Sequence, residues 1–380
     1  MSTAKISNSD NLGLRRPRRS LGALSGVALL AIAASACGSS SSSSSTTAAA
    51  SSATTAASSA TTSGSATAAA AAPVTVHVGY FPNITHGLAL VGIDEGIFAK
   101  DLAPDTLVDN QTFTAGPAEN QALLAGSIDI AFIGPSSALS SYVSSHGAVE
   151  IIAGAASGGA ALVVKSSITS PSQLKGTTLA SPQLANTQDV SLKYWLKTEG
   201  LSSSVTVQPS TTGNGTIVTE FKAGDIAGAW VPEPYVAQIV ADGGHVLVNE
   251  KTLWPAGQFS TTEVIARTAF VNAHPATVQR FLTGLYDSLA ATQSDPSGAQ
   301  TAANAQLTKL TTKALPAAEL SSAWSDLTFT LDPLESSVQT QAAHAVALGL
   351  LKNPGDISGL FNLSILNKVL AAKGQAAITS

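Results

Sequence analysis

From Val74 to about Ala266, short runs of β-branched and apolar residues alternate with stretches of helical periodicity. This alternation is typical of α/β proteins, because a strand followed by a helix can return as a parallel neighbour. The sequence therefore predicts α/β architecture with largely parallel strands. The expected strands are residues 75–80, 128–133, 151–155, 161–165, 177–180, 205–208, 227–231, 245–248 and 262–266.

The order of these elements predicts two lobes. Residues 161–262 contain a complete small α/β set, whereas the segments on either side need each other to complete a second one. We expect crossings near residues 163–166 and 260–262, with lobe 1 formed by residues 73–164 and 262–380 and lobe 2 by residues 165–261. After about His274 the pattern is wholly helical, which predicts a helical C-terminal tail. Ligands favour the cleft between two such lobes. The other expected helices are residues 87–95, 118–125, 136–144, 187–198, 217–223 and 235–242.

The amino terminus has the pattern of an export signal. Arg15, Arg16, Arg18 and Arg19 precede an apolar run at residues 21–36, which is short and rich in alanine. This pattern predicts an export signal at residues 1–36, with an N-terminal membrane-spanning anchor as the alternative. Arg18-Arg19-Ser20-Leu21 also resembles part of a twin-arginine signal, so the export route stays open between the general and the twin-arginine pathways.

The only cysteine of the chain, Cys37, follows three small residues, so an internal disulfide is excluded. The stretch Ala34-Ser35-Ala36-Cys37 resembles a bacterial lipobox, although the family prefers leucine where Ala34 stands. The resemblance implies that Cys37 is lipidated and holds the protein on the outer face of the cytoplasmic membrane. Residues 38–72 are almost entirely serine, alanine and threonine, without charge or aromatic residues. Such a segment cannot offset its chain entropy by burial, so residues 37–72 are expected to be a lipidated cysteine and a flexible tether.

The charge of the globular part argues against nucleic acid as a partner. Residues 1–37 carry five basic residues and one acidic residue, which leaves 14 basic and 23 acidic residues and a net charge of −9 for the rest. Phosphate backbones are bound by basic surfaces. An anion site in this chain must therefore be built locally, from backbone N–H groups and hydroxyls.

Four turns between a strand and a helix carry hydroxyl or amide side chains, small residues and a proline near the helix start. They are residues 80–86, 112–117, 133–137 and 181–188. Helix N-termini expose unpaired N–H groups and a partial positive charge, so several of them around one cleft would bind an anion without lysine or arginine. Ordinary helix capping explains each single turn equally well, and Asn186 with Asp189 has the pattern of a capping box variant.

Several motifs resemble the nitrate/sulfonate/taurine branch of the periplasmic binding proteins, in order and spacing over residues 74–290. Three of them are Gly79-Tyr80-Phe81-Pro82, Gly116-Pro117 and Gly228-Ala229-Trp230-Val231-Pro232-Glu233-Pro234-Tyr235. The others are the segments at residues 92–98, 125–136 and 174–176. The resemblance implies the type II periplasmic binding protein fold and a monomeric binding protein that works with an ABC permease and its ATPase subunit. It implies ligands that are small oxyanions or sulfonates. We expect a sulfonate or taurine first, a neutral or cationic pyrimidine of the thiamine type second, and nitrate or bicarbonate behind.

Carried over position by position, the resemblance implies a ligand site in the cleft without metal or other cofactor. Trp230 is equally well explained as a core residue, and Glu233 either pairs with a ligand amine or caps the helix that follows it. The implied ligand-binding residues are Asn83, Thr85, His86, Thr114, Gly116, Gly134, Pro135, Ser136, Gln183, Asn186, Thr187, Gln188, Trp230 and Glu233.

An enzyme is the main rival from another class, because one branch of this fold makes the thiamine pyrimidine with an iron segment rich in cysteine and histidine. The sequence has no such segment, no His-Glu-x-x-His, no Gly-x-Ser-x-Gly and no P-loop. We therefore expect a protein without enzymatic activity. A ligand-sensing partner of a signalling receptor remains an alternative to transport.

Overall fold

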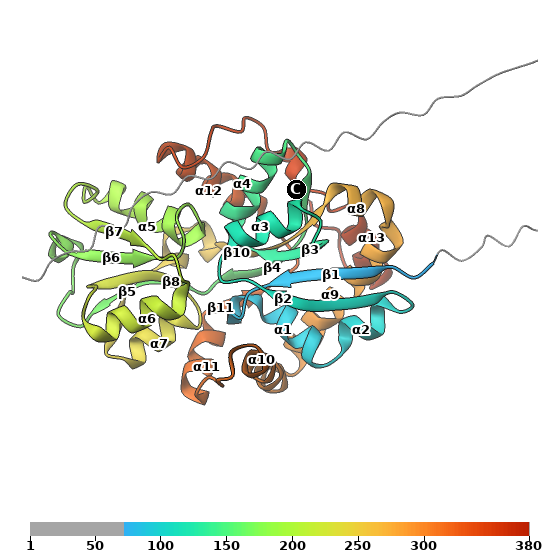
Figure 1. The fold of residues 1–380 in the computed structure, drawn as a ribbon, viewed down its shortest axis with the longest axis horizontal. Coiled ribbons are helices and arrows are strands. Elements are labelled where there is room, and N and C mark those ends of the chain that lie inside the picture. The colour runs from blue at the N-terminus through green and yellow to red at the C-terminus, as the bar shows by residue number, and fades with distance from the viewer. Residues whose placement is uncertain (1–71, 380) are drawn as a thin grey trace, which may run out of the picture. The chain divides into compact units, whose positions relative to one another are not determined.

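The computed structural model describes residues 72–379. The expected export signal, Cys37 and nearly all of the expected tether lie outside these residues. Within them the strands form two separate sheets, which are surrounded by helices (Figure 1). No helix among the described residues is both long and apolar enough to cross a membrane.

The first sheet has six strands in the order β11-β4-β10-β3-β1-β2. β1 is parallel to β2 and β3, whereas β10 is antiparallel to β3 and β4, and β11 is antiparallel to β4. The strands are β1 (Thr75–Tyr80), β2 (Thr106–Thr112), β3 (Ile130–Ile133), β4 (Val149–Gly158), β10 (Ser260–Arg267) and β11 (Leu327–Phe329).

The second sheet has five strands in the order β7-β6-β8-β5-β9. β6 is parallel to β7 and β8, whereas β5 is antiparallel to β8 and β9. The strands are β5 (Ala160–Lys165), β6 (Thr178–Ser181), β7 (Thr206–Pro209), β8 (Gly228–Pro232) and β9 (Gly244–Asn249).

Both sheets are mixed, so the prediction of largely parallel strands was wrong. The chain passes from one sheet to the other along β4 and β5 and returns from β9 to β10, without a crossover helix in either connection. A crossover helix is what brings a strand back parallel to its neighbour. β4 and β10 accordingly pair antiparallel, as do β5 and β9, and every antiparallel pair of the two sheets includes at least one of these four strands.

The first crossing lies earlier in the chain than the sequence suggested. Residues 163–165 belong to β5 of the second sheet, and the chain leaves the first sheet at Gly158 and Gly159. Both glycines have positive φ, 78° and 68°, which residues with a side chain rarely adopt. The second crossing runs through the 3-10 turns η3 (Glu250–Leu253) and η4 (Pro255–Gly257) and ends where β10 begins, near the predicted position.

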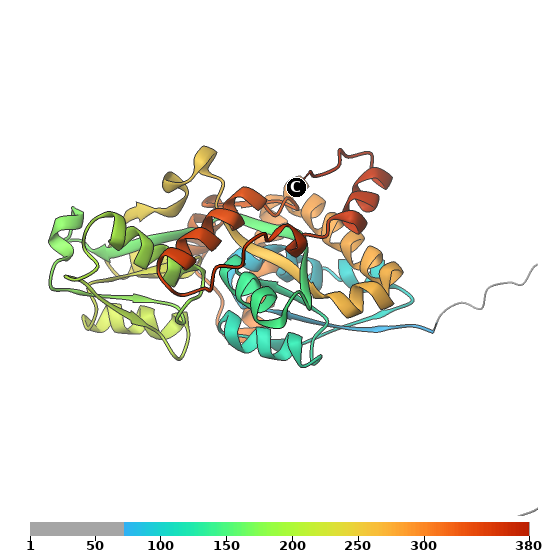
Figure 2. The same ribbon diagram turned by 90° about the horizontal axis from the view of Figure 1, so that it is seen from above.

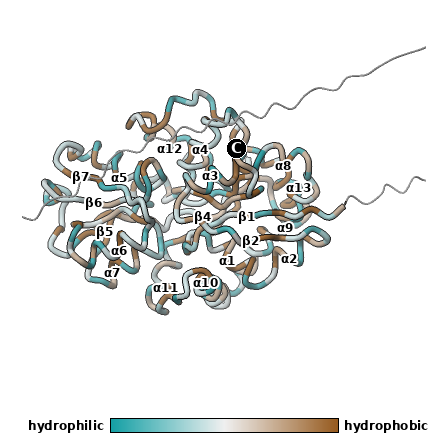
Figure 3. The backbone as a smooth tube through the Cα atoms, in the orientation of Figure 1, coloured by the Kyte–Doolittle hydropathy of each residue, from teal (hydrophilic) through white to brown (hydrophobic). Residues whose placement is uncertain are grey.

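Helices cover both faces of each sheet, because successive side chains along the central strands are buried on opposite sides. In β3, Ile130 and Phe132 belong to one apolar cluster and Ala131 and Ile133 to another. Apolar residues, brown in Figure 3, accordingly follow the central strands. The helices are α1 (Gly87–Asp94), α2 (Ile97–Leu102), α3 (Gly116–Leu124), α4 (Pro135–Ser145), α5 (Thr187–Thr198), α6 (Asn214–Ala223), α7 (Tyr235–Ala241), α8 (Thr268–Ala273), α9 (Pro275–Ser294), α10 (Pro296–Thr311), α11 (Ala317–Ser325), α12 (Glu335–Ala347) and α13 (Ser364–Ala372).

The C-terminal region is helical apart from one strand, β11, which the sequence did not predict. β11 has three residues and pairs at the edge of the first sheet with β4. A strand of this length is too short to show a period of two. The tail also joins the two sheets: α12 packs on α4 of the first sheet and on α5 of the second, and Figure 2 shows α12, in red, beside α5, in green.

Candidate functional site

A small polar cavity of about 30 Å³ lies where the helices of the two sheets meet. It has room for about one water molecule. Eight of the fourteen residues named from the sequence line it, and they come from both sheets. The lining residues are Phe81, Asn83, Thr85, His86, Gly116, Gly134, Ser137, Asn186, Thr187, Gln188, Pro232 and Thr261.

Four helical segments start at this cavity. The 3-10 turn η1 (Ile84–His86) leads into α1, and α3, α4 and α5 begin at or next to the lining residues Gly116, Gly134 and Asn186. The N-cap residues of α3 and α4 make no side-chain hydrogen bond to the helix. No N-cap side chain therefore occupies the first N–H groups of these two helices, and the first N–H of α4, that of Ser136, donates to Thr187 Oγ1 of α5 instead. The partial positive charge of both helix starts lies at the cavity.

The start of α5 differs, because Asn186 is a true N-cap. Its Oδ1 accepts a hydrogen bond from the backbone N–H of Asp189 at 3.1 Å. The Asp189 carboxylate does not return to Asn186, as a capping box would require, but accepts from Ser181 Oγ and from the Ala185 N–H. Capping and cavity lining therefore coincide at Asn186.

His86 is a neutral donor in this site. Burial lowers the pKa of its imidazole to about 3. Its Nδ1 accepts a hydrogen bond from the Phe81 N–H at 3.2 Å, so the ring proton is on Nε2. The Phe81 ring stacks on the imidazole at a centroid distance of 4.6 Å and holds its orientation. His86 therefore offers a hydrogen bond without a charge that varies over physiological pH.

None of the twelve lining residues is lysine, arginine, aspartate or glutamate. The cavity presents amides, hydroxyls, one neutral imidazole and helix N-termini. This set can bind a small anion by hydrogen bonds and dipoles, as expected from the sequence, and it contains no ionised group that would require a counter-charge on the ligand.

Helices from the two lobes, α4 and α5, are in direct contact beside the cavity. The Ser136 N–H at the start of α4 donates to Thr187 Oγ1 of α5 at 3.3 Å. A Cβ atom added to Gly134 would lie 2.5 Å from the same Oγ1, which is closer than real Cβ contacts. Gly134 has φ −70°, so the absence of a side chain is required by the approach of Thr187 and not by the backbone conformation.

Six residues named from the sequence do not line the cavity. Thr114 lies against Gly213, whose added Cβ would be 3.2 Å away. Pro135 and Ser136 adjoin lining residues in the chain, and the Gln183 carbonyl accepts from the N–H of the lining residue Asn186, but none of the three lines the cavity itself. The implied ligand role of Trp230 is not supported, because its side chain is fully buried in an apolar cluster of the second sheet. A β8 side chain that points into this core cannot also reach the cleft.

Glu233 is also buried and does not line the cavity. Its carboxylate accepts the Ala237 N–H in the first turn of α7 at 3.1 Å. Burial, and to a smaller extent the charge of Asp326, raises the pKa of Glu233 to about 8. This geometry corresponds to the helix-capping alternative and not to pairing with a ligand amine.

Four lining residues were missed by sequence reasoning: Phe81, Ser137, Pro232 and Thr261. The first three lie inside the motifs and turns named from the sequence, Ser137 and Pro232 one position and Phe81 two positions from a named residue. Thr261 lies at the start of β10, where its hydroxyl donates to the Gly158 carbonyl and so joins the two crossings. No local pattern in the sequence could have identified it.

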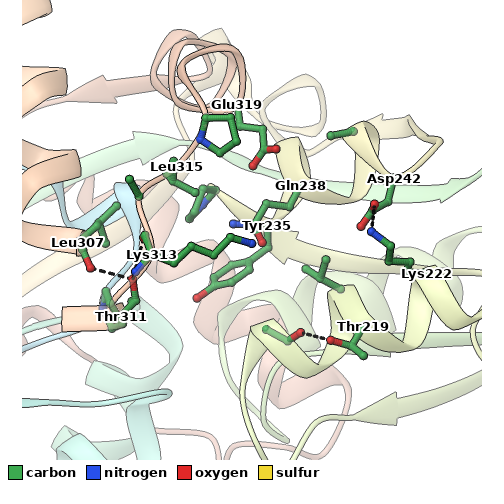
Figure 4. Close-up of a pocket in the computed structure, with 17 residues that line it drawn as sticks. Thr219, Lys222, Tyr235, Gln238, Asp242, Leu307, Thr311, Lys313, Leu315 and Glu319 are labelled. Carbon is green, nitrogen blue, oxygen red and sulfur yellow. Dashed lines mark hydrogen bonds and ion pairs between the residues drawn. The ribbon is translucent and has the colours of Figure 1, made fainter. Parts of the chain in front are cut away.

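A larger cavity, of about 480 Å³, lies between α6 and α7 and the segment that joins α10 to α11. In Figure 4 the Lys313 side chain reaches toward Gln238, and the Glu319 carboxylate points into the same space. Lysine and glutamate therefore face one cavity, and the lining also includes the Lys222–Asp242 ion pair of 2.8 Å. Helix starts border this cavity too, at Gly215, Pro234 and Pro316, but its lining carries lysine, aspartate and glutamate side chains, which the lining of the smaller cavity does not. Within residues 72–379, no cluster of histidine, cysteine, aspartate or glutamate could hold a metal ion.

Known proteins share this fold. The alkanesulfonate-binding protein of Xanthomonas axonopodis pv. citri, solved with bound MOPS, superposes with a TM-score of 0.64 at 20% identity, over 77% of this chain and 99% of that one. The nitrate-binding protein of Synechocystis PCC 6803 superposes with a TM-score of 0.64 at 14% identity, over 79% of this chain and 89% of that one. The expected type II periplasmic binding protein fold is confirmed.

Sequence comparison agrees with this fold. The taurine-binding periplasmic protein of Escherichia coli (strain K12) is 29% identical over 204 residues, which are 52% of this chain and 61% of that protein. The match thus spans less than two thirds of that relative. The NMT1-like family matches residues 69–308, which is more than half of the chain. The chain belongs to the NMT1-like family.

Proposed function

We propose that this protein is an extracytoplasmic solute-binding protein that captures a small anion in the cleft and delivers it to an ABC permease with its ATPase subunit. The observation that carries the proposal is the convergence of four helical N-termini, from both sheets, on one cavity without a charged side chain. The names of the relatives, which bind taurine, alkanesulfonate and nitrate, support an oxyanion as the ligand class.

An alkyl or amino sulfonate such as taurine is the first ligand we propose. The cavity of about 30 Å³ is too small for it as it stands, so the lobes must separate to admit it and then close on it. Smaller oxyanions, nitrate and bicarbonate, need less separation and are the alternative. The lobes that move are proposed to be residues 73–159 with 262–380 and residues 160–261. The first boundary differs from the residue 164 expected from the sequence because β5 of the second sheet begins at Ala160.

A calorimetric screen tests the ligand class. The purified protein is titrated with taurine, methanesulfonate, nitrate, bicarbonate and a thiamine-type pyrimidine, and with dimethyl sulfone as the uncharged isostere of methanesulfonate. At least one oxyanion should bind, and dimethyl sulfone should bind at least about a hundredfold more weakly than methanesulfonate, because helix dipoles and N–H donors stabilise the negative charge. Binding of dimethyl sulfone with equal affinity, or of the pyrimidine alone, would contradict an anion site.

We further propose that Cys37 carries a lipid that holds the protein at the outer face of the membrane, and that the segment after it is a tether. The small-residue run before Cys37 and the uncharged Ser/Ala/Thr segment after it support this. In a detergent phase-separation assay the wild-type protein should enter the detergent phase, and Cys37→Ala should remain in the aqueous phase. Equal partition of both forms would favour an uncleaved membrane-spanning segment.

A further inference from the structure

A third cavity, of about 340 Å³, lies between α5, the η3–η4 crossing segment and α12. It is called the aromatic cavity below, and it shares no lining residue with the cavity of about 30 Å³, which is called the oxyanion cavity after its proposed ligand. Its walls come from both lobes, because Trp195 of α5 belongs to the core of the second sheet, whereas Val338 and Ala342 of α12 belong to a core cluster of the first. The proposed function makes no use of this cavity.

Aromatic rings form much of its wall. The Tyr194 ring stacks on the His344 imidazole at a centroid distance of 3.5 Å and an interplanar angle of 12°. The Trp254 ring lies 5.7 Å from the same imidazole, and Trp195 lines the cavity from α5. Burial lowers the pKa of His344, so its ring is neutral at pH 7 and does not repel a cation. Three electron-rich rings around one space attract a cation through their quadrupoles.

A carboxylate lies in the same cavity. Glu250 is 1% exposed, and Trp230 Nε1 donates to its Oε2 at 2.7 Å, while Ser191 Oγ donates to Oε1. These contacts fix its position in the cavity wall. An ionised carboxylate in such an apolar setting is costly unless a positive charge is near. A cation within the cavity would supply that charge.

The lysines near this region make other contacts. Lys193 is bound to the Asp189 carboxylate at 2.7 Å, Lys197 to the Ala347 carbonyl at 2.9 Å, and Lys251 to Asp326 at 2.9 Å. No lysine or arginine lines the cavity. Among the described residues, therefore, no cationic side chain occupies the space next to Glu250.

We propose that this cavity is a second binding site, which takes an organic cation such as a quaternary ammonium group. The aromatic rings would surround the alkylated nitrogen and Glu250 would balance its charge. The inference rests on Tyr194, Trp195, Trp254 and Glu250, and it is independent of the oxyanion site.

Choline and 3,3-dimethylbutan-1-ol form a matched pair of ligands, because they have the same shape and differ in the positive charge. Three of the four tryptophans of the chain, Trp195, Trp230 and Trp254, lie in or next to the site, so intrinsic fluorescence reports on it. In titrations at pH 8 without any oxyanion, choline should change the fluorescence, and the neutral alcohol should bind at least about tenfold more weakly. Choline should also slow hydrogen exchange in α5 and α12.

Two variants and one control locate the effect. Trp254→Ala removes a ring that is only partly buried, and Glu250→Gln can still accept from Trp230 while its NH₂ group donates to Ser191. Each should weaken choline binding at least about tenfold. Trp324→Phe, which alters a tryptophan that packs on Phe329 instead, should bind choline as the wild type does. Equal binding of the neutral alcohol, no choline binding below about 10 mM, or unchanged binding in folded Trp254→Ala and Glu250→Gln would each overturn the proposal.

Discussion

The two cavities at the lobe junction differ in the groups that set their electrostatic potential. The oxyanion cavity has no ionisable side chain that titrates near neutral pH, and its positive potential comes from helix N-termini and N–H donors. The aromatic cavity has a buried carboxylate, Glu250, whose pKa burial raises to about 7. Dipoles cannot be titrated or displaced, whereas a buried carboxylate responds to pH and to a neighbouring cation. We therefore expect ligand affinity at the oxyanion cavity to be constant over pH and ligand affinity at the aromatic cavity to vary with pH.

The largest effect is expected from a variant that blocks closure of the oxyanion cavity and leaves its hydrogen-bond donors unchanged. Gly134→Ala should lower the affinity for the bound oxyanion about a hundredfold, because the new Cβ would meet Thr187 Oγ1 as the lobes close. Calorimetry measures the affinity, and small-angle scattering should show ligand-induced compaction in the wild type only. Stability without ligand should not change, since φ at Gly134 suits alanine.

The double variant Gly134→Ala/Thr187→Ala tests the cause of that loss. Removing the Thr187 hydroxyl relieves the clash, so the double variant should bind better than Gly134→Ala alone. Gly215→Ala is the matched control, because an added Cβ there meets no atom within 4 Å. Equal losses for Gly134→Ala and the double variant would show that steric closure is not the cause.

The next effect is the pH dependence of stability that the buried carboxylate of Glu250, in the aromatic cavity, should cause. The pKa of Glu250 is about 7 in the folded protein and about 4.5 in the unfolded chain, so the folded state binds more protons between these values. Its contribution to stability is therefore fully present below about pH 4.5 and is lost as pH rises through 7. Glu250→Gln should remove this loss. Between pH 4.5 and 8 its free energy of unfolding should therefore fall by roughly 3 kcal/mol less than that of the wild type.

Thermal unfolding across that pH range measures the difference. Thr187→Ala, in the oxyanion cavity, should leave the wild-type slope unchanged, because it alters no ionisable group. If the free energy of unfolding of Glu250→Gln varies with pH as steeply as that of the wild type, Glu250 is already ionised at about pH 4.5. The contrast between the cavities would then be wrong.

A smaller effect is expected at Glu233. It is a buried carboxylate, like Glu250, but it lies close to the oxyanion cavity. Since its carboxylate caps α7, Glu233→Gln should change the affinities for taurine and for ethanesulfonate by the same factor, within about threefold. Calorimetry on both ligands is the measurement. A loss of tenfold or more that is confined to taurine would show that the carboxylate reaches the ligand amine.

The smallest effect is the constancy of oxyanion binding over pH. With the pKa of His86 near 3 and no other titrating side chain in the lining, affinity for a strong-acid anion such as nitrate or a sulfonate should vary less than about twofold between pH 5 and 8. Choline affinity should instead rise as pH passes through 7 and Glu250 ionises. Parallel pH profiles for both ligands would remove the distinction between the sites.

Local sequence patterns predicted most of the elements, because strand and helix periods depend on nearest neighbours. The expected strand at residues 75–80 and the expected helix at residues 187–198 agree with β1 and α5. Short or polar elements escaped this reasoning: β2, with the sequence TLVDNQT, has no clear apolar alternation, and α2 has only six residues. Strand direction was also missed, since it depends on how the chain crosses between sheets.

The sequence by itself determined the helix starts that surround the oxyanion cavity, because prolines, small residues and hydroxyls at strand ends act within one turn of the backbone. Only the tertiary structure decided which neighbouring side chains face the cavity, placing Ser137 and not Ser136 in its lining and Trp230 in the core. The aromatic cavity depends on it entirely, since Tyr194, Trp254 and His344 are far apart in the chain and meet only where the lobes pack. Burial and through-space contact set these features, and neither has a local period.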